Sequence, residues 1–123
     1  MKLNPDCVRD ILFTVEEHST LDRGVNYPDE ELEKLSDYSK DEILYHIKQC
    51  ELSGLVTEVS WFLGGTCYIS YLSPIGHEFL ADIRSDTNWN KTKDVAKKVG
   101  SFSLSTLKDI SAQVIAEVIK KSF

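Results

Sequence analysis

The sequence predicts an α+β fold for this chain of 123 residues. Three observations lead to that prediction. Residues 39–54 carry the cap and apolar spacing of a helix, residues 55–72 read as a two-stranded hairpin, and capped helices stand on both sides of this pair. We expect residues 1–84 to form the main domain. Residues 85–123 are then a basic helical extension that packs on the domain or on a second subunit.

The first helix is predicted to begin at Asn4, a favourable N-cap, with Pro5 in the first helical position. Its apolar residues repeat at helical spacing: Val8, Ile11, Leu12 and Val15. The polar stretch 20–31, which contains Gly24 and Pro28, is predicted to be a connecting loop. A brief helix over 29–36 is favoured next, with a short strand left open.

The central helix is predicted to begin after Ser39, which forms a capping-box pattern with Glu42, and to close at Gly54. The expected inward residues are Ile43, Leu44, Ile47 and Cys50. The expected side and outward residues are Tyr45, His46, Lys48 and Gln49. The hairpin follows, with strands over 55–61 and 66–72 and a turn at Gly64-Gly65.

Ser73-Pro74 predicts another helix start. Residues 86–90 are predicted to be a polar joint, with Trp89 packed against the body of the protein. A short basic helix is expected over 91–99, ended by Gly100. Ser103 caps a final helix whose apolar stripe, Leu104–Ile119, is wide enough to need a partner surface. We therefore expect this helix to pack on its own domain or to form a homodimer.

Charge is divided unevenly along the chain, whose net charge is −6. Residues 1–83 carry 6 Lys and Arg against 16 Asp and Glu, whereas residues 84–123 carry 8 against 4. This balance counts against strong non-specific nucleic-acid binding. No apolar run approaches a membrane span, and the first residues lack a signal-peptide pattern, so we expect a cytoplasmic protein without membrane contact. Three widely spaced cysteines predict reduced, buried thiols.

The order of helix, short element, helix ending in G-L-V, hairpin and helix resembles a winged helix-turn-helix, in which the hairpin is the wing. The passage Y-I-S-Y-L-S-P-I-G-H-E-F-L is similar to the second wing strand and following helix of several such families. G-H-E-F-L-x-x-I-R, together with N-P-D-C-V-R-D-I-L and S-G-L-V, narrows the resemblance to an uncharacterised domain-of-unknown-function family of bacteria and prophages, over residues 1–110. That resemblance implies a prophage setting and no particular activity.

In a winged fold, the central helix reads double-stranded DNA from the major groove. The candidate contacts on that helix are Lys40, Tyr45, His46, Lys48 and Gln49. The candidate phosphate contacts in the extension are Lys91, Lys93, Lys97 and Lys98. However, three acidic residues share the central helix with its two lysines, and winged folds are also used to bind proteins.

The hairpin tip, defined here as Trp61, Phe62 and Leu63, is apolar, where DNA-binding wings carry cations. These side chains form a protein-binding patch or fold back onto the last helix, and we favour the second arrangement. His46 and Cys50 have the spacing of two metal ligands but lack a second pair nearby, so no metal or other cofactor is expected. No catalytic motif accompanies His77, and we expect no enzyme. The two hypotheses are a DNA-binding or transcription-associated accessory factor and a protein-interaction module on the same scaffold.

Overall fold

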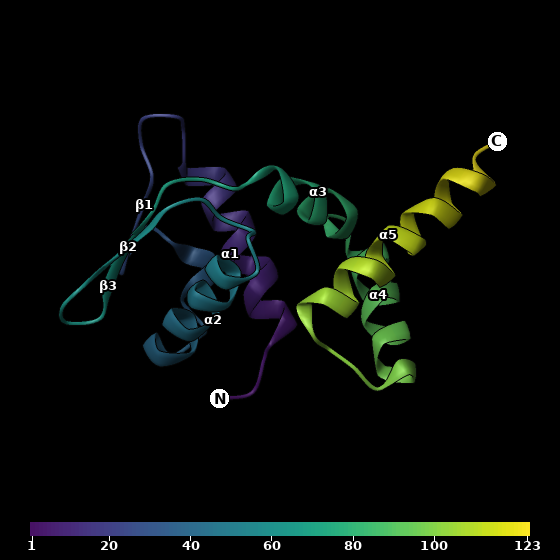
Figure 1. Cartoon of the computed structure of the whole chain (residues 1–123), viewed down its shortest axis with the longest axis horizontal. Helices are drawn as coiled ribbons and strands as arrows, with labels where there is room; N and C mark the ends of the chain where they lie inside the picture. The colour runs from purple at the N-terminus through teal and green to yellow at the C-terminus, as the bar shows by residue number, and fades with distance from the viewer. The chain divides into compact units, whose positions relative to one another are not determined.

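The computed structural model describes all 123 residues as two compact units, 1–77 and 78–123 (Figure 1). The elements in chain order are α1 (Pro5–His18), β1 (Val25–Tyr27), the 3-10 helix η1 (Glu33–Leu35), α2 (Lys40–Leu52), β2 (Val59–Phe62), β3 (Thr66–Ile69), α3 (Pro74–Ile83), α4 (Asp86–Val99) and α5 (Leu104–Lys121). The α+β class is confirmed. No helix combines the length and the apolar character that crossing a membrane requires.

Helix α1 begins and ends where its sequence predicts. The Asn4 carboxamide oxygen accepts hydrogen bonds from the backbone N–H groups of Asp6 and Cys7, which have no partner within the helix. The apolar face of α1 is buried, and the helix packs against α2 and η1.

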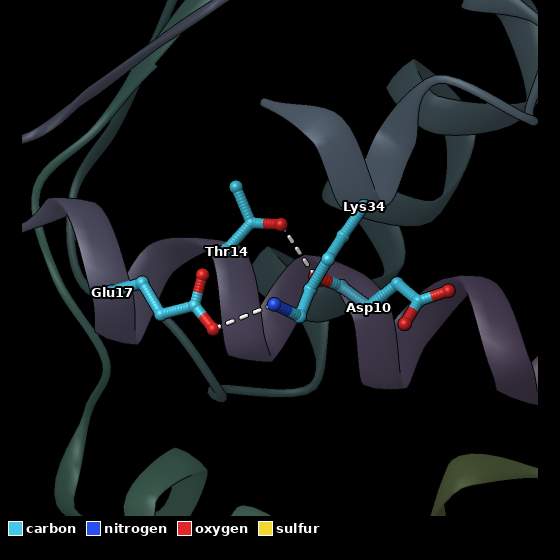
Figure 2. A network of polar contacts seen from close by, with 4 residues as sticks. All are labelled: Asp10, Thr14, Glu17 and Lys34. Atoms are coloured by element: carbon cyan, nitrogen blue, oxygen red, sulfur yellow. Dashed lines mark hydrogen bonds and ion pairs between the residues drawn. The ribbon is translucent and has the colours of Figure 1, made fainter. Parts of the chain in front are cut away.

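The brief helix expected over 29–36 is a single 3-10 turn, Glu33–Leu35, held on α1 by polar contacts (Figure 2). Lys34 Nζ lies 2.7 Å from Glu17 Oε1. The same ammonium lies 5.9 Å from the centre of the Phe13 ring. Figure 2 also shows Thr14 Oγ1 donating to the carbonyl oxygen of Asp10 within α1. The contacts of Lys34 with Glu17 and Phe13 therefore hold the short turn against α1.

The predicted loop over 20–31 is wrong at Val25–Tyr27, which form strand β1. This strand pairs antiparallel with β3, so that Val25 lies opposite Ile69 and Tyr27 opposite Cys67. Gly24 allows the approach, because a side-chain carbon there would lie 2.2 Å from the carbonyl oxygen of Ile69. Three residues cannot form a strand alone, so the strand exists because of a partner more than forty residues away.

Helix α2 is capped as predicted at both ends. Ser39 Oγ accepts from the N–H of Glu42, and Gly54 closes the helix at a φ of +71°. The N–H of Gly54 bonds the carbonyl of Glu51 while the N–H of Leu55 bonds that of Cys50, the two bonds of a Schellman motif. Glu42 does not complete a capping box in the predicted way, since its carboxylate accepts from the Asn4 side chain.

The hairpin forms, but its strands are shorter than predicted. β2 begins at Val59 rather than at Leu55, and β3 ends at Ile69 rather than at Leu72. Glu58, at a φ of +24°, ends the regular ladder. Beyond it the N–H of Thr57 still donates to the carbonyl oxygen of Tyr71, and an isolated bridge joins Val56 to Leu72. The sheet order is β1-β3-β2, all antiparallel, so β2 is an edge strand.

Ser73 and Pro74 begin α3 as predicted. Ser73 Oγ accepts from the N–H of Gly76 and donates to the carbonyl oxygen of Gly54, so one hydroxyl links the start of α3 to the end of α2. At Gly76 a side-chain carbon would lie 1.9 Å from the carbonyl oxygen of Leu55. The absence of a side chain therefore lets the two segments approach at this point.

In the second unit, α4 and α5 pack against each other. The polar joint predicted over 86–90 is wrong, because these residues are the first turn of α4, whose N-cap Ser85 accepts from the N–H of Asn88. Trp89 is buried, as expected. Gly100 ends α4 at a φ of +84°, and Ser103 caps α5, both as predicted.

Candidate functional site

The hairpin tip is held against α2 by a cluster of three side chains. Lys48 Nζ lies 2.8 Å from Glu51 Oε1, and Trp61 Nε1 donates to the same oxygen at 3.1 Å. The Lys48 ammonium also lies 5.3 Å from the centre of the Trp61 ring, within cation–π range. One carboxylate thus accepts from both the helix cation and the strand indole, so the tip has a defined position on α2.

Lys40, the other cation of α2, reaches the hairpin turn. Its Nζ donates to the carbonyl oxygen of Gly64 at 3.0 Å. A side-chain carbon at Gly65 would lie 2.9 Å from Lys40 Cε, which shows how closely the lysine stem follows the turn. Both lysines predicted to contact DNA from this helix therefore make contacts within the chain in this structure.

His46, predicted to lie on the outward side of α2, is completely buried. Its Nε2 accepts from the backbone N–H of Asn4 at 2.7 Å, and its Nδ1 lies 2.7 Å from the carbonyl oxygen of Glu42. Because an N–H only donates and a carbonyl only accepts, these partners require the neutral ring with the proton on Nδ1. His46 therefore links the start of α1 to the first turn of α2 and cannot read DNA.

The sequence contained the signal for this burial. Ile43, His46, Ile47 and Cys50 follow the i, i+3, i+4, i+7 spacing of one helix face. The structure buries all four, whereas Leu44 is half-buried. Of the other outward candidates, Gln49 is half-buried and Tyr45 is 38% exposed, with the centre of its ring 5.4 Å from the centre of the His46 ring. The outward face of α2 therefore presents one aromatic ring and no unoccupied cation.

The apolar residues of the hairpin tip are exposed. Leu63 is 100% exposed, Phe62 57% and Trp61 38%. Trp61 contacts Lys48 and Glu51 of α2, whereas Phe62 and Leu63 are exposed, and their packing onto the last helix stays a prediction. Residues at the tip of a two-stranded hairpin have few neighbours to cover them, and β2, which leads to this tip, is an edge strand.

The lysines of α4 divide into two groups. Lys91, Lys97 and Lys98 are exposed. Lys93 is half-buried, with its Nζ 5.4 Å from the centre of the Trp89 ring. Three of the four predicted phosphate contacts thus present their ammonium groups on the surface.

The three cysteines are buried and, as the redox argument predicts, carry free thiols. Burial raises the pKa of Cys7 to about 12, with the charges of Glu42 and Asp10 adding to the effect. Burial likewise raises the pKa of Cys67 to about 11, aided by the charge of Glu51, and raises that of Cys50. Thiols that stay protonated at neutral pH are poor nucleophiles and poor metal ligands.

The His46–Cys50 pair is also unsuited to metal binding, since both ring nitrogens of His46 are occupied by backbone groups. No three His, Cys, Asp or Glu side chains gather in a group that could hold a metal ion. Of the residues predicted from the sequence to bind a partner, those left exposed and without a contact in the core are at the hairpin tip and on α4.

Comparisons with known proteins identify the family of this chain. The chain is 31% identical over 122 residues to a protein of Haemophilus influenzae described as uncharacterized, and the match covers 97% of this chain and 99% of the relative. No solved structure matches the chain. The model of the family described as "Hypothetical protein (DUF2513)" matches residues 2–103, and the chain belongs to that family.

Proposed function

We propose that this chain is a protein-interaction module built on a winged-helix scaffold, with the hairpin tip as its contact surface. The observation that carries the proposal is the full exposure of Leu63 beside Phe62, on a hairpin held in place by Lys40, Lys48 and Glu51. The order helix, strand, helix, helix, hairpin, with the first strand added beside the second hairpin strand, supports the scaffold.

A protein partner fits this chemistry better than DNA does. The tip has no cation of its own, and both lysines of α2 are engaged by the hairpin. An apolar pocket on a partner would bury Phe62 and Leu63, each contributing on the order of 1.5–3 kcal/mol when fully covered. Because the hairpin is already positioned, little conformational freedom is lost on binding.

The test compares Leu63→Asp with Leu21→Asp, which places the same charge at an 83% exposed leucine outside the tip. Each tagged protein is incubated with DNase-treated lysate of the organism that encodes the chain, and captured proteins are quantified by mass spectrometry. We expect a protein captured by the wild type and by Leu21→Asp to be lost with Leu63→Asp. Identical captured sets for all three baits contradict the proposal.

A second candidate is a DNA-binding or transcription-associated accessory factor. The observation in its favour is the exposure of Lys91, Lys97 and Lys98 on α4. Three phosphate contacts give a log–log salt slope no steeper than about −3 and only weak, salt-sensitive affinity. Fluorescence anisotropy with a mixed-sequence duplex at low salt tests this. Binding abolished by Lys97→Glu/Lys98→Glu supports it, and no binding at on the order of 10 μM protein eliminates it.

A further inference from the structure

The second unit contains an apolar groove of about 300 Å³ between α4 and α5. Its floor is formed by Val95, Ile110 and Val114. Val118 extends the same row, since Ile110, Val114 and Val118 are each four residues apart on α5, and it is 41% exposed. The apolar stripe that the sequence predicted as a dimer surface is thus divided. Leu104, Leu107 and Val114 are buried within the chain, whereas Ile110 is half-buried and Val118 is exposed.

The two sides of the groove carry opposite charges. Lys91 stands on the α4 side, and Asp109 and Glu117 stand on the α5 side. All three side chains are exposed. The two acids are eight residues apart, about 12 Å along the helix. Lys91 lines the same groove as both, so a basic side faces an acidic side across an apolar floor.

We propose that a second copy of this chain docks in the groove, about a two-fold axis that runs along it. Such a rotation exchanges the two sides without changing position along the groove. It places Lys91 of each copy against Asp109 and Glu117 of the other, and the apolar floors meet between them. The distribution of charge is therefore self-complementary, which favours a second copy over a partner of one uniform charge. This inference does not depend on the role of the hairpin tip.

The oligomeric state tests the proposal. Light scattering coupled to size exclusion, at high micromolar concentration and low salt, is expected to give twice the 14.0 kDa of the chain. Lys91→Glu is expected to weaken the dimer by about tenfold or more, because two contacts per dimer become repulsive. Lys97→Glu makes the same charge change at an exposed site on α4 outside the groove and should leave the dimer unchanged.

Mixing two variants makes the test specific to this geometry. Lys91→Glu repels its own copy at the acidic side, and Asp109→Lys/Glu117→Lys repels its own copy at the basic side. A mixed dimer of the two variants restores both attractive contacts. We expect each variant alone to dimerise about tenfold or more weakly than the wild type and the mixture to regain the affinity, with circular dichroism showing that both variants are folded. A wild type that remains at 14.0 kDa overturns the proposal, as does a dimer that is equally stable in Lys91→Glu and Lys97→Glu or a mixture that stays monomeric.

Discussion

At the scale of single residues, His46 shows how a polar side chain becomes part of the core. It is buried between two backbone groups, the N–H of Asn4 and the carbonyl of Glu42, and its ring satisfies both. Removing one partner of a buried hydrogen bond leaves the other unsatisfied, at a cost of about 1–3 kcal/mol. His46 thus has a structural role, in which it stabilises the contact between α1 and α2, and it does not bind a ligand.

We predict that His46→Ala lowers the free energy of unfolding by about 2–4 kcal/mol, because two backbone groups lose their partner and a cavity is left. The matched control is His77→Ala, at an exposed histidine. This variant should change the free energy of unfolding by less than about 0.5 kcal/mol. Urea denaturation followed by circular dichroism measures both. Equal, small effects would show that the buried bonds of His46 contribute nothing.

The buried thiols predict how stability depends on alkaline pH. The pKa values of Cys7 and Cys67 are raised in the folded chain from the ordinary 9.0 to about 12 and about 11. The unfolded chain therefore releases these protons at lower pH than the folded chain does. The stabilisation is fully present below pH 9 and is lost as the pH rises toward 11.

We expect the urea midpoint of the wild type to fall between pH 9 and pH 11. The midpoint of Cys67→Ala should fall less steeply over this range, because one such thiol is absent. At neutral pH a thiol reagent should modify no cysteine in the native chain and all three in denaturant. Rapid labelling of the native chain would contradict the burial of these groups.

At the scale of elements, the hairpin depends on contacts that cross from β2 to α2. Lys48 contacts both the Trp61 ring and the Glu51 carboxylate, which itself accepts from Trp61. A shared partner makes the contributions of Lys48 and Trp61 interdependent. The position of the tip therefore follows from this cluster as well as from the strand pairing.

We predict that a double-mutant cycle of Lys48→Ala and Trp61→Ala gives a coupling energy of about 0.5–1 kcal/mol. Lys34→Ala, which removes a lysine bonded to Glu17, should combine additively with Trp61→Ala, to within about 0.3 kcal/mol. Chemical denaturation of the four chains in each cycle provides the values. Additivity in the Lys48 cycle would mean that the cluster does not position the tip.

The start of α3 gives a prediction that runs against helix propensity. Replacing glycine by alanine inside a helix ordinarily stabilises the folded protein by up to about 1 kcal/mol. At Gly76 the added carbon would lie 1.9 Å from a backbone oxygen of Leu55, so we expect Gly76→Ala to destabilise by about 1–3 kcal/mol. Ile75→Ala, at a 51% exposed neighbour, should cost less than about 0.5 kcal/mol. A stabilising Gly76→Ala in thermal denaturation would refute the close approach.

At the scale of the whole molecule, charge and the candidate binding surfaces are divided between the two units. Residues 1–77 carry 6 Lys and Arg against 14 Asp and Glu, whereas residues 78–123 carry 8 against 6. The first unit presents the apolar hairpin tip, and the second presents the exposed lysines and the α4–α5 groove. The tip, the lysines and the groove can therefore be tested by separate substitutions.

The sequence by itself determined most of the helix ends, because these ends are specified locally, although the start of α4 after Ser85 was missed. Asn4, Ser39 and Ser103 bond N–H groups two or three residues away, and Gly54 and Gly100 supply the left-handed conformation that ends a helix. The turn at Gly64-Gly65 was predictable for the same reason. The exposed hairpin tip and basic α4 residues could be named as candidates, since residue type alone marks them.

Only the tertiary structure decided which of these candidates are available. Strand β1 depends on β3, His46 on the N–H of Asn4, and Lys40 on the carbonyl of Gly64, all partners distant in sequence. Spacing along one element can indicate a buried face, as it does for His46, but it cannot show which partner lies against that face, because such contacts form where different elements meet. The sequence placed His46 and Lys40 on a DNA-reading face, and packing against other elements gave both a structural role.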